Sequence, residues 1–437
     1  MSTEAIAGLM IVFMLAIMFI RVPIGIAMML AGALGYGIID DFSTLFFYMK
    51  GSSFGQMANN GFSVIPLFLL MGNLASRSGL SKSLFDGANA FIGHRRGGLA
   101  LAAVGGCGLF GAICGSSLAT ASTMGQVALP EMRRHGYKGA LSTGALAAGG
   151  TLGILIPPSI VLIIYAILTE QNIAKLFLAA MVPGAMAIVG YMLVIMIIVK
   201  IRPDYADKTE KASWSERGKA LINLIPASFL FIGVLGGIYA GVFTPTEAAA
   251  FGVIATTVIA ILNRQLTLGG FVESLKVTAV NTGMIFIIIL GADIFNAFLS
   301  LSGMPDFLAD WIVSRDMSPM LVLVVMLLVY LVLGCLMDSL SMVLLTIPIF
   351  FPAIMMLDFG MTYEQTALWF GIICLIVVEV GMITPPIGLN VFIINKLAGD
   401  VPMSETFKGV LPFLGSDIVR VILLIAFPVL TWGIIPN

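Results

Sequence analysis

The chain has 437 residues, of which 59% are hydrophobic and only 10% are charged, and its mean hydropathy is +1.07. Soluble proteins carry about 25% charged residues, so this composition excludes a soluble domain and indicates a membrane protein. The net charge of −1, without a basic arm, also excludes a nucleic-acid-binding protein.

The N-terminal segment has an acidic residue and no basic cluster before its apolar stretch. A cleaved signal peptide is therefore not expected, and this stretch should remain as a membrane span. The cysteines lie in apolar segments without metal-binding spacing, so we expect them to be packing residues (Cys107, Cys114, Cys335 and Cys374). We expect no transition metal and no cofactor.

The predicted elements fall into two halves, because about 20 apolar residues are needed to span the hydrocarbon. The first half, 1–200, is predicted to contain three spans, a hairpin, a broken helix and a final span (Ala5–Ile20, Val22–Ile39, Phe62–Ser76, about 97–132, about 139–169, Leu176–Val199). A polar cytoplasmic linker, 201–219, follows. The second half, 220–437, repeats the series (Ala220–Gly241, Pro245–Asn263, Val277–Ser300, about 317–357, about 365–395, Val410–Trp432). The fold is thus predicted to be all-α and polytopic, with ten crossings besides the hairpins.

The two hairpins are predicted from length and charge. Gly97–Pro130 has no formal charge, and basic residues bracket it. As one helix it would reach about 51 Å, too long for one crossing, while two crossings need about 40 residues. Basic clusters at both ends also favour the same side of the membrane. A re-entrant hairpin with its tip near Gly115-Ser116-Ser117 satisfies both constraints. For 317–357, which Asp338 interrupts, length alone also permits two full spans.

With the N-terminus outside and both stretches re-entrant, most of the 22 basic residues fall on the cytoplasmic side. Both termini are therefore predicted to be periplasmic. The halves also match weakly in sequence. Three pairs of segments align in order (Ser78-Gly79-Leu80 with Ser302-Gly303-Met304, 111–116 with 334–339, 153–158 with 381–386). Because the first copy starts outside and the second inside, this is an inverted-topology repeat, which is typical of secondary transporters.

The paired prolines at 157–158 and 385–386 interrupt two spans at matching positions. A single proline usually marks a kink, but two matched breaks in lipid favour carbonyls that face a polar site and coordinate a cation. Glycines and hydroxyls at the hairpin tips could instead serve close helix packing. Asp338, a carboxylate in an apolar stretch, favours a functional role. Asp293 and Glu379 could equally be structural.

We therefore predict two symmetry-related sodium sites, each formed by a hairpin tip and a broken helix. Their candidate residues are Gly115, Ser116, Ser117, Gly153 and Pro157 in the first half, and Asp338, Ser339, Gly381, Thr384 and Pro385 in the second. The predicted substrate-binding residues are Thr120, Ser341 and Asn390.

Three motifs carry a family resemblance: GxxCGSS at the first hairpin, GILIPPSIVLIIYA from Gly153 and GMITPPIGLNVF from Gly381. With these, the chain resembles, along essentially its whole length, the large membrane subunit of tripartite ATP-independent periplasmic (TRAP) transporters. The resemblance implies an elevator-type inverted-repeat transporter of the bacterial inner membrane and sodium-coupled import of a carboxylate, such as a sialic acid or a C4-dicarboxylate. Overall likeness favours a sialic acid. It also implies two partners, a separate four-helix small membrane subunit and a periplasmic substrate-binding protein.

The hairpin tips depart from the Ser-Asn-Thr motif that is common in the wider ion-transporter superfamily, so cation and carboxylate could be held differently. A stand-alone sodium–carboxylate symporter of the same superfamily, which needs no binding protein, remains an alternative. A membrane-embedded enzyme is a remote alternative, because the sequence contains neither HExxH nor GxSxG in a plausible context.

Overall fold

The computed structural model describes residues 2–58, 60–305, 307, 314 and 317–435, and within them it is helical without strands. The first half contains α1 to α10 (Thr3–Phe19, Ile24–Ile39, Phe42–Met57, Val64–Ser76, Leu80–Ile92, Gly98–Cys114, Ser117–Arg134, Gly139–Leu155, Ile160–Leu168, Ile173–Ile201) and the 3-10 turn η1 (Asn60–Ser63). The linker holds η2 (Pro203–Tyr205).

The second half starts with α11 (Trp214–Phe231), which continues through the π-helical segment η3 (Ile232–Gly236) into α12 (Gly237–Tyr239). It then contains α13, α14, α16, α17, α18, α19, α20 and α21 (Pro245–Leu262, Leu268–Ser302, Pro319–Gly334, Ser339–Met355, Tyr363–Gly381, Leu389–Ala398, Met403–Ala426, Val429–Trp432). The stretch that follows Ser302-Gly303-Met304, the segment matched with Ser78-Gly79-Leu80, lies mostly outside the described residues.

Six helices of the described part are long and apolar enough to cross a membrane: α10, α11 with its continuation, α13, α14, α18 and α20. The pair α8 and α9, bent by 42°, gives a seventh. The prediction of ten crossings therefore exceeds what helix length supports. The difference lies in α1, α2 and α4, which have 17, 16 and 13 residues. Their apolar runs include turn residues, such as those around Pro23, that the structure leaves outside the helices.

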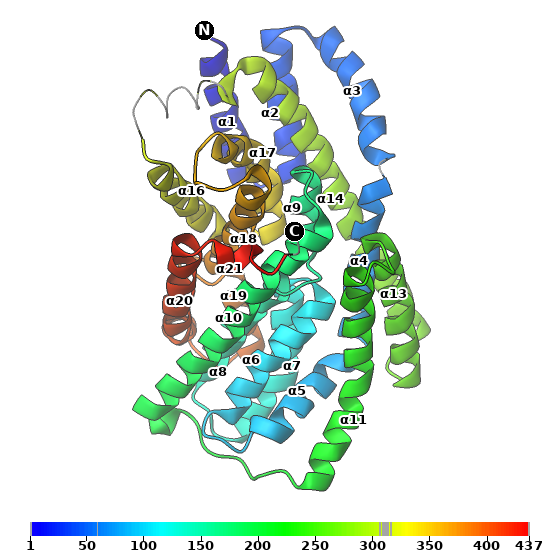
Figure 1. Cartoon of the computed structure of the whole chain (residues 1–437), viewed down its shortest axis with the longest axis vertical. Coiled ribbons are helices and arrows are strands. Elements are labelled where there is room, and N and C mark those ends of the chain that lie inside the picture. The colour runs from blue at the N-terminus through cyan, green and yellow to red at the C-terminus, as the bar shows by residue number, and fades with distance from the viewer. Residues whose placement is uncertain (1, 59, 306, 308–313, 315–316, 436–437) are drawn as a thin grey trace.

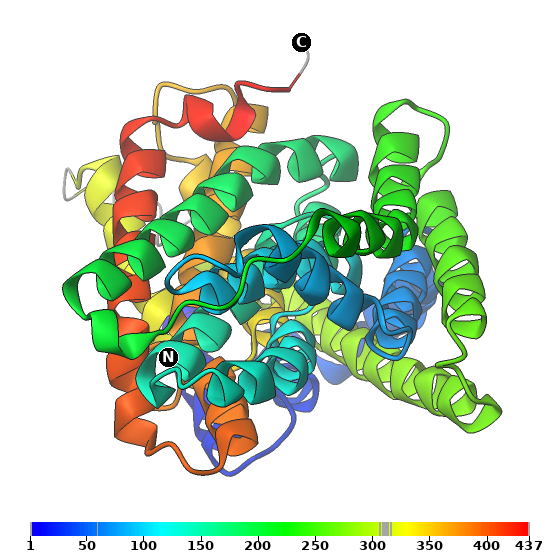
Figure 2. The ribbon, with the colours of Figure 1, turned by 90° about the horizontal axis from the view of Figure 1, so that it is seen from below.

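The helices are arranged along one long axis. Figure 1 shows α1, α2, α3, α16 and α17 around the end that holds the N-terminus, while α5, α7 and the start of α11 lie at the opposite end with the linker. Seen from below, α4 and α13 lie on one side and α20 on the other (Figure 2). All four cysteines are buried and free, as predicted for packing residues.

Helix α3 was not predicted, and its side chains provide the hydrogen-bond partners of the Asp293 carboxylate in the apolar helix α14. The hydroxyl of Tyr48 on α3 donates a hydrogen bond to the Asp293 carboxylate on α14 at 3.2 Å, and that of Ser52 donates to its other oxygen. Asp293 therefore fastens α3 to α14. Two other acidic residues also have structural partners: Glu247 completes a capping box with Thr244, and Asp417 pairs with Arg420 at 2.7 Å.

The predicted topology can be checked with single cysteines on exposed positions of α3, of the turn between α5 and α6, and of the linker. We expect Lys50→Cys to react with an impermeant thiol reagent from outside intact cells, and Arg95→Cys and Lys208→Cys to react only after permeabilisation. These three side chains are exposed. External labelling of Arg95→Cys with Lys208→Cys protected would contradict the first re-entrant hairpin. Two further expected outside positions, Asp306 and Asn437, lie outside the described residues.

Candidate functional site

Two helix–turn–helix units form the centre of the site. The first joins α6 to α7 through Gly115, whose φ of +66° favours glycine, and Ser116. Ser116 caps α7 by accepting a hydrogen bond from the Ala119 N–H. The second joins α16 to α17, and Asp338 caps α17. Both turns fall where the sequence predicted hairpin tips.

The cap positions correct the alignment of the two tips by one residue. The sequence match places Gly115 opposite Asp338, but in the structure Ser116 and Asp338 occupy the same N-cap position. The shift arises because a single left-handed glycine ends α6, whereas a three-residue turn, 335–337, follows α16. Ser117 and Ser339 are consequently equivalent, each as the first residue of its helix.

The carboxylate of Asp338 caps the N-terminus of α17. Its two oxygens accept hydrogen bonds from the Ser341 N–H at 3.2 Å and the Ser341 hydroxyl at 2.6 Å. Negative charge at a helix N-terminus is stabilised by the helix dipole. A structural role therefore accounts for part of the cost of this carboxylate, and its remaining exposed surface lines a cavity.

Each tip packs closely against a proline break. A methyl group on Gly111 would lie 2.9 Å from the Gly153 nitrogen, and one on Gly381 would lie 2.6 Å from the Gly334 Cα. The Gly111–Gly153 and Gly334–Gly381 pairs join α6 to α8 and α16 to α18 at matching positions of the two halves. The structure thus brings each tip beside its own broken helix. Both Pro-Pro bonds there are cis.

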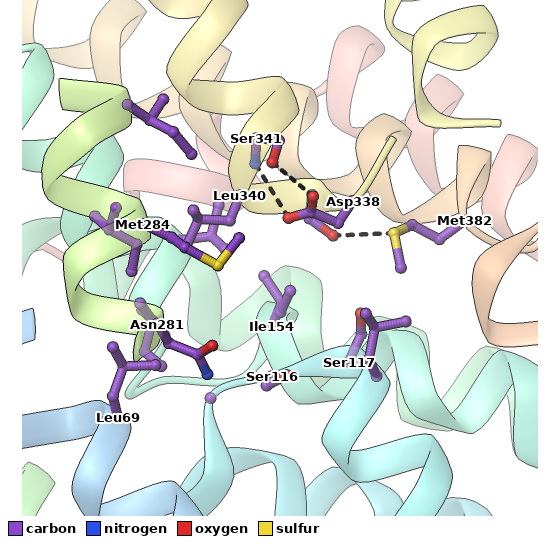
Figure 3. Close-up of a pocket in the computed structure, with 17 residues that line it drawn as sticks. Leu69, Ser116, Ser117, Ile154, Asn281, Met284, Asp338, Leu340, Ser341 and Met382 are labelled. Carbon is purple, nitrogen blue, oxygen red and sulfur yellow. Dashed lines mark hydrogen bonds between the residues drawn. The ribbon is translucent and has the colours of Figure 1, made fainter. Parts of the chain in front are cut away.

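The two tips face each other across a cavity of about 280 Å³ (Figure 3). Six of the predicted site residues line it: Gly115, Ser116, Ser117, Asp338, Ser339 and Ser341. The first residues of α9 and α17 also line this cavity, so their backbone amides and dipoles favour negative charge there. A second cavity of about 580 Å³ shares Asp338 and Ser341 with it.

The remaining predicted residues lie outside the lining of both cavities, as far as the described residues show (Thr120, Gly153, Pro157, Gly381, Thr384, Pro385 and Asn390). The Thr384 hydroxyl donates to the Val380 carbonyl at 2.6 Å. Thr120 and Asn390 are fully buried, and neither the Thr120 hydroxyl nor the Asn390 amide has a hydrogen-bond partner. Gly153 approaches Thr120 and Gly150 approaches Asn390, so these two polar groups lie along one face of α8.

The far wall of the cavity comes from two predicted spans that the sequence did not place at the site. Leu69 on α4 and Asn281, Met284, Ile285 and Ile288 on α14 complete the lining. Figure 3 shows Asn281 and Met284 across the cavity from the two tips. The only available signal was that Asn281 is a polar residue within the predicted span Val277–Ser300. Apart from this amide, the α14 wall is apolar.

One carboxyl group contacts both tips. The Glu379 side chain on α18 is buried, and its Oε1 accepts hydrogen bonds from the hydroxyls of Ser117, at 3.5 Å, and Ser339. Its Oε2 has no partner. Sequence reasoning left Glu379 undecided because its contacts depend on packing between helices far apart in the chain.

These features define the class of protein: a polytopic membrane transporter in which paired helical turns meet broken helices around a central cavity. A family model described as "Tripartite ATP-independent periplasmic transporter, DctM component" matches residues 11–430. The chain therefore belongs to the DctM family of TRAP transporter large permeases, and it is an inner-membrane protein rather than an enzyme.

Curated relatives agree with this assignment. The chain is 38% identical to the C4-dicarboxylate TRAP transporter large permease protein DctM of Pseudomonas aeruginosa, over 85% of each chain. It is 32% identical to the Rhodobacter capsulatus protein of the same name, over 100% of this chain and 99% of the relative. It is 29% identical to the sialic acid TRAP transporter large permease protein SiaM of Vibrio cholerae, over 95% of each.

A solved structure shares the fold. The Alcanivorax borkumensis YdaH transporter matches with a TM-score of 0.59 and 16% sequence identity, over 90% of each chain.

Proposed function

We propose that this chain imports an organic carboxylate by coupling its movement to sodium. The observation that carries the proposal is the composition of the central cavity. Its described lining, and that of the second cavity, include the acidic Asp338 but no lysine or arginine. An anionic substrate there therefore needs positive charge from helix N-termini and from bound cations. Cotransported sodium supplies that charge.

The sodium ligands that we propose are oxygens at the two tips and the breaks behind them. Sodium is a hard cation that binds several oxygen atoms. Both tips provide hydroxyls and backbone carbonyls, and the second tip also carries the carboxylate of Asp338. The Ser116 carbonyl oxygen, one such ligand, lies beside Gly153. In the second half the Ser339 hydroxyl contacts the sulfur of Met382, the residue that follows Gly381. This contact places the second tip beside its broken helix. Thr120, Ser341 and Asn390 are proposed to contact substrate.

An elevator movement is supported by the asymmetry of the cavity walls. The two tips supply the polar groups, whereas Met284, Ile285 and Ile288 of α14 present an apolar wall. A surface with few hydrogen bonds can slide past the tips without breaking many of them. We therefore propose that the tips carry substrate and sodium past α14 and α4.

Two partners are proposed from family membership, since TRAP large permeases work with a small permease and a periplasmic binding protein. The binding protein would deliver the substrate, and the small subunit would cover part of the apolar surface in the membrane. Identity is higher with the C4-dicarboxylate relatives than with the sialic acid relative. We therefore propose a C4-dicarboxylate as substrate, in place of the sialic acid that overall sequence likeness favoured.

Uptake into proteoliposomes tests the proposal. We expect succinate uptake only when the chain, the small subunit, a cognate binding protein and an inward sodium gradient are all present. N-acetylneuraminate is tested in parallel as the alternative substrate, and we expect it not to be taken up. Full uptake by the chain alone would support a stand-alone symporter. Equal uptake with choline replacing sodium would refute sodium coupling.

Ser116→Ala and Thr384→Ala locate the cation sites in the same assay. Ser116→Ala removes a hydroxyl, and Thr384→Ala removes a hydroxyl and one methyl group, so most apolar packing stays intact and we expect the half-saturating sodium concentration to rise while protein level stays close to wild type. Unchanged sodium dependence in both variants would place the cation sites elsewhere.

A further inference from the structure

Glu379 occupies a position that the repeat does not duplicate. It lies two residues before Gly381, which packs against Gly334, and the residue two before Gly153 is Thr151. The Thr151 hydroxyl bonds the Ala148 carbonyl at 2.6 Å and the Tyr191 hydroxyl at 3.0 Å. Thr151 thus joins α8 to α10, whereas Glu379 joins α18 to the tips. One carboxyl group on α18 therefore contacts the tips of both halves.

Both hydrogen bonds to Glu379 come from equivalent residues. Ser117 and Ser339 are the first residues of α7 and α17, directly after the caps. Because both hydroxyls reach the same oxygen, a shift of one tip changes the geometry of the bond to the other. The second oxygen is buried and has no hydrogen-bond partner among the residues that the structure describes.

Acidic groups surround Glu379, so a cation that binds nearby stabilises its carboxylate. The acidic neighbours that act on it electrostatically are Asp338 at the second tip and Asp417 on α20. Asp417 is already paired with Arg420 and also accepts a hydrogen bond from Tyr191 at 2.7 Å. A buried carboxylate with acidic neighbours is stabilised when a cation binds close by. Loading of either tip would therefore also act on Glu379.

We infer that Glu379 is a positioning residue that couples the two cation sites, so that an ion bound at one tip raises the affinity of the other. This inference rests on the sodium coupling proposed above. Because such coupling is reciprocal, it gives sodium dependence a Hill coefficient above 1. Coupling of this kind typically changes affinity about 5- to 150-fold.

The test measures sodium-dependent succinate uptake by the complete transporter with Glu379→Gln. Glutamine keeps the shape and one acceptor oxygen but removes the charge. We expect the Hill coefficient of uptake to fall below its wild-type value, that of equilibrium sodium binding to fall to 1, and the half-saturating sodium concentration to rise about tenfold, within the range given for coupled sites. The matched control is Thr151→Val, which alters the equivalent position of the first half and should leave the Hill coefficient at its wild-type value.

A mutant cycle separates coupling from a merely structural role. If Glu379 acts through the two serines, Ser117→Ala with Ser339→Ala should lower the Hill coefficient to the same value, and adding Glu379→Gln should change it no further. Sodium-dependent thermal stabilisation of the purified variants, with choline chloride as the reference salt, gives a binding readout without turnover.

The outcomes distinguish the two proposals. A wild-type transporter without sodium dependence would overturn sodium coupling, and this inference with it. A sodium-dependent wild type whose Hill coefficient is unchanged by Glu379→Gln would overturn the inference alone. Equal losses in Glu379→Gln and Thr151→Val would also overturn it, because they would indicate general destabilisation.

Discussion

Replacing Gly153 by alanine is expected to lower uptake at least tenfold while the chain still inserts and folds. A methyl group at this position would lie 2.7 Å from the Ser116 carbonyl oxygen and would also meet the Thr120 hydroxyl. Inserting a carbon atom into such a contact costs about 1–3 kcal/mol. The first tip must therefore move away from α8, and the proposed cation ligands separate. Uptake and sodium-dependent thermal stabilisation both measure this loss.

Gly283→Ala is the control for Gly153→Ala. Gly283 also lies within a helix, α14, but a methyl group there meets nothing within 4 Å. Alanine favours a helix over glycine by about 1 kcal/mol, so this variant should transport normally and be slightly more stable. Normal uptake by Gly153→Ala would show that the tip does not depend on this close contact.

Arg420→Met is expected to destabilise the folded chain by about 3–5 kcal/mol, the usual effect of removing one partner from a buried ion pair. Arg420 and Asp417 are both buried, and Asp417 also accepts the hydrogen bond from Tyr191. Without the guanidinium group, Asp417 becomes an unpaired carboxylate inside the membrane. The expected result is a large fall in melting temperature and in membrane-inserted protein.

The double variant Asp417→Asn with Arg420→Met checks the cause. It removes both charges and keeps an acceptor for the Tyr191 hydroxyl, so we expect it to recover most of the lost stability. A double variant as unstable as Arg420→Met alone would show that the arginine acts through packing rather than through charge pairing.

The sequence predicted the parts of this site that depend on local chemistry. Glycine and serine between two charge-bracketed apolar runs located the first tip, and the matched proline pairs located the breaks behind both tips. Three predicted crossings, those of α1, α2 and α4, correspond to helices shorter than 18 residues, because hydrophobicity continues through residues that turn the chain. Helix α3 was missed because Phe42–Met57 mixes polar and aromatic residues without an apolar stripe.

The contacts between distant helices could not be predicted from the sequence. Asp293 and Glu379 are both acidic residues in apolar runs, yet the first fastens α3 to α14 and the second contacts both tips. Tertiary packing separates these roles: Asp293 contacts Tyr48, 245 positions away, and Glu379 contacts Ser339 and Ser117, 40 and 262 positions away. The same holds for Asn281, whose exposure to the cavity depends on where α14 crosses the tips.

The pairing of α2 with α14 places unequal lengths side by side in the membrane. A methyl group on Gly25 would lie 2.8 Å from the Ile287 backbone, so the two helices touch. With 16 and 35 residues, they extend about 24 Å and 52 Å along their axes, against a hydrocarbon thickness of about 30 Å. Helix α2 alone is too short to cross and α14 is longer than the hydrocarbon is thick, so α14 must tilt or project from the bilayer. The fit of this transporter to its bilayer therefore depends on the acyl-chain length of the lipids.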